Sequence, residues 1–150
     1  MIVEGMGIVV AVGAVILDNE GRVLLGRHKP ERRGFWAGKW ICPGGKLMEG
    51  ETIKDGILRE VMEETHLSIE LCDPLPPFER IVWDEGSVVL HVIYIDYTAR
   101  VVGGELEPDS DLGEAIWVSC DELRSIWYEL HEDTRILLTN ARLCDWMGEA

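Results

Sequence analysis

The sequence predicts a single α+β domain, or an α/β/α sandwich, that spans residues 1–150. Several apolar segments are short and rich in β-branched residues, which is typical of strands, whereas two segments begin with helix-capping residues. A chain of 150 residues suits one hydrophobic core, and neither a repeat nor a low-complexity linker divides it. We therefore expect a β-rich fold with two or three helices.

The first part of the chain is expected to contain strands, a basic loop and a helix. The order is a buried strand at 7–17, a turn at 18–21, a short strand at 23–26, a loop at 27–39 and a short strand at 40–42. Thr52 and Asp55 fit a capping box, so a helix should run from about residue 52 to residue 65.

The second part is expected to supply further strands and a terminal helix. Strands are predicted at 67–72, 79–83, 88–98 and 114–118, with a Gly- and acid-rich loop at 103–114. Ser119 and Glu122 form a second capping box, and residues 132–147 are predicted to form the terminal helix.

The chain carries a formal net charge of −14, which argues against binding to a nucleic acid polymer. The charge is uneven, because residues 22–59 hold nine Lys and Arg but only four acidic residues. A small anionic ligand that arrives with a divalent metal would suit this segment, and an ordinary exposed basic loop would explain it equally well. No run of about 18 apolar residues occurs, so we expect no membrane span.

The four cysteines are far apart in the sequence and form no C-x-x-C motif, so neither a zinc site nor a redox pair is expected. They are Cys42, Cys72, Cys120 and Cys144. Reduced, mostly buried thiols in a cytoplasmic protein are the predicted state.

The helix at 52–65 is predicted to have an apolar arc and a separate acidic arc. At about 100° per residue, the apolar arc holds Ile57, Leu58, Val61, Met62 and Thr65, and the other holds Gly56, Glu60, Glu63 and Glu64. Like charges at this spacing cost a few tenths of a kcal/mol per pair, which a solvated acidic face tolerates. Three facing carboxylates are also what Mg²⁺ binds, and a spare one could act as a general base.

Gly44 and Gly45 precede this helix and are followed directly by Lys46. Two glycines let the backbone turn sharply and approach a ligand, so that a carbonyl could reach the same metal. Lys46 could meet a phosphate, although no Walker motif is present and a plain turn is the simpler interpretation of these three residues alone.

The combined pattern resembles the box of the Nudix hydrolase family. Five residues separate Gly45 from Glu51, seven more precede Arg59-Glu60, and then come an apolar residue, any residue, Glu-Glu, any residue and an apolar residue after position 66. All defining positions match except the last glycine, which is His66 here. Glycine would let the helix end in a left-handed conformation at little cost, so we predict strained or altered geometry at His66.

This resemblance implies an α/β/α sandwich with a mixed β-sheet and a hydrolase that depends on Mg²⁺ or Mn²⁺. By position, it implies that Glu60, Glu63 and Glu64 are metal ligands, together with the carbonyl of Gly44. One of the glutamates, or an acid in a later loop, would act as the base. Arg59 and Glu51 resemble the pair that orients the ligand helix.

Residues outside the box are similar to the MutT-type subgroup, in particular to the animal enzymes that hydrolyse oxidised purine nucleoside triphosphates. The resemblance implies that Trp127 stacks on the base beside Glu129, and packing of Trp127 in the core is the alternative. Asp111 is the candidate for a distant catalytic carboxylate. Ile41 departs from that subgroup, which has an Asn there that reads the base. Trp36 and Trp40 stay ambiguous.

The resemblance favours a pyrophosphohydrolase that splits nucleoside triphosphates into nucleoside monophosphate and pyrophosphate, with Lys46 and arginines of the 27–39 loop, Arg27 among them, holding the phosphates. An ADP-ribose or other nucleoside-diphosphate pyrophosphatase is the second hypothesis. A nucleotide sensor without turnover is the third, and the intact glutamate set argues against it. The partner is then a small-molecule nucleotide, and a homodimer stays open.

Overall fold

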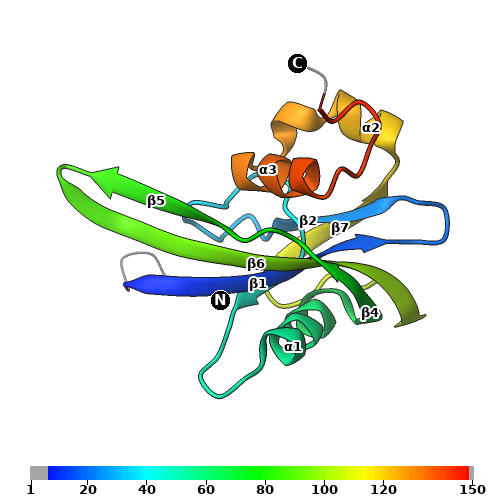
Figure 1. The fold of residues 1–150 in the computed structure, drawn as a ribbon, viewed down its shortest axis with the longest axis horizontal. Helices are drawn as coiled ribbons and strands as arrows, with labels where there is room; N and C mark the ends of the chain where they lie inside the picture. Colours follow the sequence, from blue (N-terminus) through cyan, green and yellow to red (C-terminus); the bar gives the residue numbers. More distant parts are fainter. Residues whose placement is uncertain (1–6, 149–150) are drawn as a thin grey trace.

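The computed structural model describes residues 7–148 and contains a mixed β-sheet flanked by helices (Figure 1). The strands are β1 (Ile8–Leu17), β2 (Val23–His28), β3 (Gly44–Lys46), β4 (Leu67–Pro74), β5 (Phe78–Asp84), β6 (Ser87–Gly104) and β7 (Leu112–Val118). The helices are α1 (Ile53–Thr65), α2 (Cys120–Ser125) and α3 (Glu132–Asn140), with a short 3₁₀ helix η1 (Trp127–Glu129). The predicted α+β class and mixed sheet are confirmed.

The sheet is built around β1, in the order β4-β6-β1-β2-β7. β1 runs parallel to β6 and antiparallel to β2, while β3 pairs with β1 and β5 pairs with β6. A central strand that is covered on both faces reads as a continuous apolar run, which explains the β-branched segment near the start of the sequence. The pairing of β1 with β3 places Gly13 opposite Gly44 and Val12 opposite Gly45.

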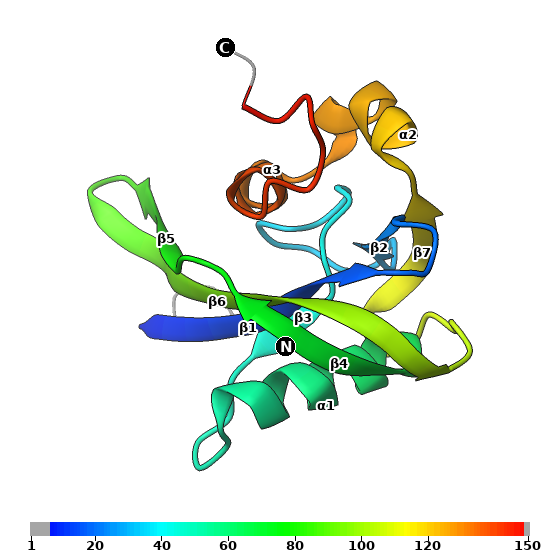
Figure 2. The ribbon, with the colours of Figure 1, turned by 45° about the vertical axis from the view of Figure 1, so that its right-hand side comes forward.

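Helices cover the two faces of the sheet, with α1 on one side and α2, η1 and α3 on the other (Figure 2). Alternate residues of β1 serve the two cores, because successive side chains of a strand point to opposite faces. Val12 and Ile16 pack with Ile57 of α1, whereas Val15 packs with Leu138 of α3.

The predicted faces of α1 are partly wrong. Leu58 and Met62 are exposed, at 39% and 44%, whereas Glu60 and Glu64 are buried, at 5% and 3%. The helix packs against β1 and β3, and the Glu60 carboxylate lies against Gly45. This packing, and not the apolarity of the side chains alone, decides which face of the helix is buried. The two glutamates are therefore on the same face as the core residues.

Several element boundaries also differ from the expectation. β6 continues to Gly104 and β7 begins at Leu112, so the predicted loop at 103–114 is shorter than expected. Pairing of β6 with β4 carries it further than its own apolar pattern shows. The terminal helix stops at Asn140, before a left-handed residue at Arg142 (φ 51°). Residues 40–42 form no strand, and within them Trp40 and Ile41 make isolated bridges.

A disulfide joins Cys120 at the start of α2 to Cys144 after α3. The prediction that all four cysteines are reduced is therefore wrong for this pair, while Cys42 and Cys72 are free thiols. The two bonded cysteines are 24 residues apart and meet only because α2 and α3 pack together, so no local motif marks them. The bond anchors the segment that follows α3.

None of the helices within residues 7–148 is long and apolar enough to cross a lipid bilayer.

Candidate active site

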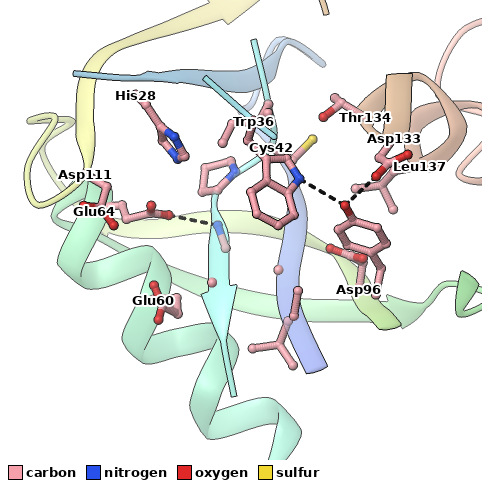
Figure 3. A pocket seen from close by; sticks show the side chains of 18 of the residues that line it. His28, Trp36, Cys42, Glu60, Glu64, Asp96, Asp111, Asp133, Thr134 and Leu137 are labelled. Atoms are coloured by element: carbon pink, nitrogen blue, oxygen red, sulfur yellow. Dashed lines mark hydrogen bonds between the residues drawn. The ribbon is translucent and has the colours of Figure 1, made fainter. Parts of the chain in front are cut away.

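A cavity opens between α1, the loop before β3 and the face of the sheet that carries α3 (Figure 3). Acidic and basic side chains line one end, and aromatic and acidic side chains line the other. The lining residues are Ala11, Val12, Gly13, His28, Arg32, Trp36, Ile41, Cys42, Pro43, Gly44, Gly45, Glu60, Glu64, Phe78, Tyr94, Asp96, Asp111, Asp133, Thr134 and Leu137. The cavity therefore contains four of the predicted site residues, which are Gly44, Glu60, Glu64 and Asp111.

The carboxylates of α1 at this end are held against the glycines of β3. The backbone N–H of Gly44 donates to Glu64 Oε1 at 2.9 Å. A Cβ atom on Gly45 would lie 2.5 Å from the Glu60 carboxylate, so any larger residue would push that group away. Burial raises the pKa of Glu64 well above its usual value, and the nearby charges of Glu60 and Asp111 raise it further, against the Gly44 bond.

Arg59, in the middle of α1, pairs with Glu51, which lies just before the helix begins. Its Nε and Nη2 donate to the two oxygens of Glu51 at 2.6 and 2.9 Å, and this pairing lowers the pKa of Glu51 to about 2. Nη2 also donates to the carbonyl of Lys46 at 3.0 Å. The structure thus places Arg59 and Glu51 together as the resemblance implies, where they fix α1 relative to β3.

Arg59 also contacts the remaining acids of the box. Its Nη1 lies 2.9 Å from Glu60 Oε1 and 3.2 Å from Glu63 Oε2. Glu63 is exposed and does not line the cavity, unlike Glu60 and Glu64. Within residues 7–148, no three acidic, His or Cys side chains already converge as a metal-binding group.

The donor chemistry of this end nevertheless fits a hard divalent cation. Two buried carboxylates lie beside backbone that has no Cβ at Gly45, and within the described residues the Glu64 carboxylate accepts a single hydrogen bond, from the N–H of Gly44. Mg²⁺ and Mn²⁺ bind carboxylate, carbonyl and water oxygens, and neither Cys nor His is needed.

Two buried nitrogens beside the acids have no hydrogen-bond partner within the described part of the chain. They are Nε of Arg32 and Nδ1 of His28. Arg32 Nε lies 3.7 Å from Asp111 Oδ1, which exceeds hydrogen-bond distance. Burial lowers the pKa of His28, and the charge of Arg32 lowers it further. Both side chains are therefore available to an anionic ligand in the cavity.

A hydrogen-bonded chain forms the other end of the cavity. Trp36 Nε1 donates to Tyr94 Oη at 3.0 Å, and that hydroxyl donates to Asp133 Oδ2 at 2.5 Å (Figure 3). Arg80 holds the second oxygen of Asp133 at 2.6 Å, and Phe78 stacks on Tyr94 with ring centroids 4.7 Å apart. These contacts lock the aromatic rings that line the cavity.

Asp96 of β6 lies in the cavity wall and is only 7% exposed. Within residues 7–148 its carboxyl makes no hydrogen bond, although its main-chain carbonyl accepts one from Leu75. Burial raises the pKa of this carboxyl to about 7. An acid of this kind is protonated in part near neutral pH and can donate to a ligand or accept from it.

Two residues expected to hold phosphate lie outside the cavity lining. Arg27 pairs with Glu114 at 2.6 Å and lies over the ring of Trp40 at 4.5 Å, so its charge is already balanced by an acidic partner. Lys46 is exposed at the end of β3, where its carbonyl accepts from Arg59. Arg32, another arginine of the basic loop, does line the cavity.

Trp127 is half-buried and packs against the core, as the alternative interpretation held, and it does not line the cavity. It packs edge-to-face on Trp146 with centroids 5.1 Å apart, and it belongs to the cluster around α3. Glu129 is exposed, and its hydrogen bonds in the described part of the chain are made by its backbone, whose carbonyl accepts from the N–H of Trp40 and whose N–H donates to Ile126. The tryptophan that lines the cavity is Trp36, which the sequence left ambiguous.

The sequence carries a weak signal for some of the missed residues. Asp96 interrupts an apolar run in β6, and an acid at a buried strand position indicates a function or a partner. Asp133 gives no such signal, because an acid in the first turn of a helix is ordinary. His28 and Arg32 look like surface residues of a basic loop.

Replacing Asp96 by Asn should make the protein more stable at neutral pH when no ligand is present. The pKa of Asp96 is higher in the folded chain, about 7, than its usual value of 3.8, so the folded state binds the proton more tightly. Wild-type stability should therefore fall between about pH 4 and pH 7, by at most roughly 4 kcal/mol. Urea unfolding across this pH range measures the difference.

The Glu85→Gln variant is the matched control, since it removes one charge from an exposed turn far from the cavity. The Asn variant should equal wild type near pH 4 and exceed it at pH 7. A difference in the free energy of unfolding between the Asn variant and wild type that is the same at all pH values would contradict the raised pKa of Asp96.

The comparisons with known proteins agree with this geometry. The NUDIX domain profile matches residues 7–139. Oxidized purine nucleoside triphosphate hydrolases of Mus musculus and Danio rerio are 57% and 48% identical over 119 and 118 residues, which cover 79% and 77% of this chain and 65% and 64% of theirs. The chain thus spans less than two thirds of the length of these relatives.

Two further similarities are informative. An ADP-ribose pyrophosphatase of Methanocaldococcus jannaschii is 30% identical over 117 residues, covering 78% of this chain and 65% of that protein. The crystal structure of a MutT NUDIX hydrolase from Burkholderia pseudomallei superposes with a TM-score of 0.74 at 29% identity, covering 89% of this chain and 97% of that one. The chain belongs to the NUDIX domain family.

Proposed function

We propose that this protein is a metal-dependent pyrophosphohydrolase of nucleoside triphosphates. The observation that carries the proposal is the layout of the cavity. At one end of the cavity lie buried carboxylates and two buried nitrogens without a hydrogen-bond partner among the described residues, and at the other lie hydrogen-bonded aromatic residues and the Asp96 carboxyl. A nucleotide has the matching layout, with phosphates that require cations at one end and a flat base at the other.

Glu60 and Glu64, with the exposed Glu63 and the carbonyl of Gly44, would hold the divalent cation, Mg²⁺ or Mn²⁺. When bound, the cation would offset the buried negative charge, polarise a phosphoryl oxygen and lower the pKa of a coordinated water. The chain itself holds α1 in place through Arg59 and Glu51.

The reaction consumes one water and breaks one phosphoric anhydride bond. A water oxygen forms a bond to one of the two phosphorus atoms that share the bridging oxygen, and the bridging oxygen leaves with the other phosphorus, so that nucleoside monophosphate and pyrophosphate result. Arg32 would neutralise charge on the phosphates, and Asp111 would orient the water or take its proton. Both residues line the cavity beside Glu64.

The base would lie between the aromatic residues at the opposite end, beside Trp36, with Asp96 at its edge. The curated relatives named oxidized purine nucleoside triphosphate hydrolase make oxidised purine nucleotides the first substrates to try. Ile41 lines the cavity and offers no hydrogen bond from its side chain, so the recognition of the base edge would fall to Asp96.

ADP-ribose hydrolysis is the second candidate, which the similarity to an ADP-ribose pyrophosphatase supports. It needs the same attack on a diphosphate but a ribose in place of the terminal phosphate. A sensor without turnover would not need both buried glutamates. The cytoplasmic location and the homodimer remain predictions from the sequence.

The protein should hydrolyse nucleoside triphosphates only when a divalent cation is present. The test is incubation with Mg²⁺ and a panel of dNTPs, oxidised dNTPs, ADP-ribose and diadenosine polyphosphates, with the products identified by ³¹P NMR. Monophosphate and pyrophosphate are expected, and ¹⁸O-labelled water shows which phosphorus is attacked. EDTA should abolish turnover. The Glu64→Gln variant should lose most of its turnover, whereas the control variant Glu85→Gln should keep wild-type turnover. Binding without any metal-dependent turnover would reject the proposal.

Trp36→Ala and Trp127→Ala separate the base-binding tryptophan from the packing tryptophan. Loss of stacking at Trp36 should raise KM by about tenfold, since a base–aromatic contact contributes roughly 1–3 kcal/mol. Trp127→Ala should instead lower the free energy of unfolding by about 3 kcal/mol with KM unchanged. Steady-state kinetics and urea unfolding of both variants measure these effects, and the reverse pattern would place the base at Trp127.

A further inference from the structure

His66 ends α1 at the position where the Nudix box has glycine. Its backbone is left-handed (φ 61°, ψ 19°), which is the strained geometry predicted for a non-glycine residue here, and its N–H donates to the carbonyl of Met62. A non-glycine residue in this conformation is less favourable than glycine. The helix end alone therefore does not account for a histidine here.

The imidazole of His66 contacts two acids of the loop between β6 and β7. Nε2 lies 2.8 Å from Asp109 Oδ2, and Nδ1 lies 3.2 Å from Glu107 Oε2. The histidine and both acids are exposed by more than a third, so these contacts add little to global stability. Their effect is to fix where the loop lies.

The same loop is tied to the last turn of α1 through its backbone. The N–H groups of Glu107 and Asp109 donate to the carbonyls of Thr65 and Glu64, both at 2.9 Å. These two carbonyls belong to the end of a helix, where helical partners are missing. The loop thus caps the helix that carries the box glutamates.

Asp109 also holds the turn that contains Asp111. Its Oδ1 accepts from the N–H of Ser110, which is left-handed (φ 56°), and its carbonyl accepts from Leu112. Asp111 lies inside this turn and lines the cavity, where its charge acts on Glu64. One chain of contacts therefore runs from His66 through Asp109 to the acid in the cavity.

We propose that His66 is a positioning residue, which fastens the 105–111 loop to the end of α1 so that Asp111 stays beside Glu64. The inference rests on the proposed function, because it assigns a catalytic effect to the place of Asp111. His66 itself does not line the cavity and touches no substrate. Compared with glycine, histidine adopts the left-handed conformation less favourably, but its side chain holds the loop.

The test is His66→Gly, which restores the glycine of the box. Because glycine suits the left-handed conformation, the unfolding midpoint should stay the same or rise. The kcat should nevertheless fall by about tenfold, because small displacements of a reacting group are costly. KM should change by less than about twofold, since no substrate contact is removed. Glu85→Gly is the matched control, because it replaces another left-handed residue (φ 49°) in a distant turn, and its kcat should equal wild type.

Hydrogen exchange of the amides of residues 107–112 measures the loop without any substrate. These amides should exchange faster in His66→Gly and in a second variant, Asp109→Asn, than in wild type. Unchanged exchange would overturn the fastening itself. Faster exchange with a wild-type kcat would overturn the positioning effect. A wild-type protein without turnover on the whole panel would instead reject the proposed function.

The Asp111→Asn background tests whether His66 acts through Asp111. If it does, adding His66→Gly to Asp111→Asn should leave the residual kcat unchanged within about twofold. A further tenfold loss in the double variant would show independent action and would overturn the proposal.

Discussion

The structure depends on the burial of two carboxylates between α1 and the glycine backbone of β3. Removing a carboxylate from water is costly unless hydrogen bonds or an opposite charge compensate it. Here Glu64 receives one N–H from Gly44 and Glu60 receives one contact from Arg59. The compensation is incomplete, in line with the raised pKa of Glu64, and in the proposed function a divalent cation would complete it.

The surrounding elements follow from this constraint. Gly45 has to lack a Cβ so that Glu60 fits, and the Glu51–Arg59 pair has to hold the helix against the strand. The chain is strongly acidic overall, yet Arg32 reaches the cavity from the basic segment. Negative charge from α1 and positive charge from the loop thus meet at one end, which is the arrangement needed by a metal-bound polyphosphate.

The sequence predicted the parts of the site whose spacing is local. The helix, its Thr52 cap, the Glu51–Arg59 pair and the left-handed end at His66 are all confirmed. The sequence-based prediction failed where tertiary packing decides which side chains are buried. Ranking the side chains of α1 by apolarity placed Met62 in the core and left the glutamates on the surface. The cavity's aromatic end escaped prediction, since Trp36 and Trp127 both sit in plausible sequence contexts and only the fold distinguishes them.

The most direct test of the central claim is the effect of Mg²⁺ on the unfolding of wild type and Glu64→Gln. In EDTA at neutral pH, the Gln variant should be the more stable protein, because it lacks the buried charge. Added Mg²⁺ should stabilise wild type, by about 2.7 kcal/mol at a concentration 100 times its Kd, and stabilise the variant far less. Equal stabilisation of both proteins, or none in wild type, would contradict the account.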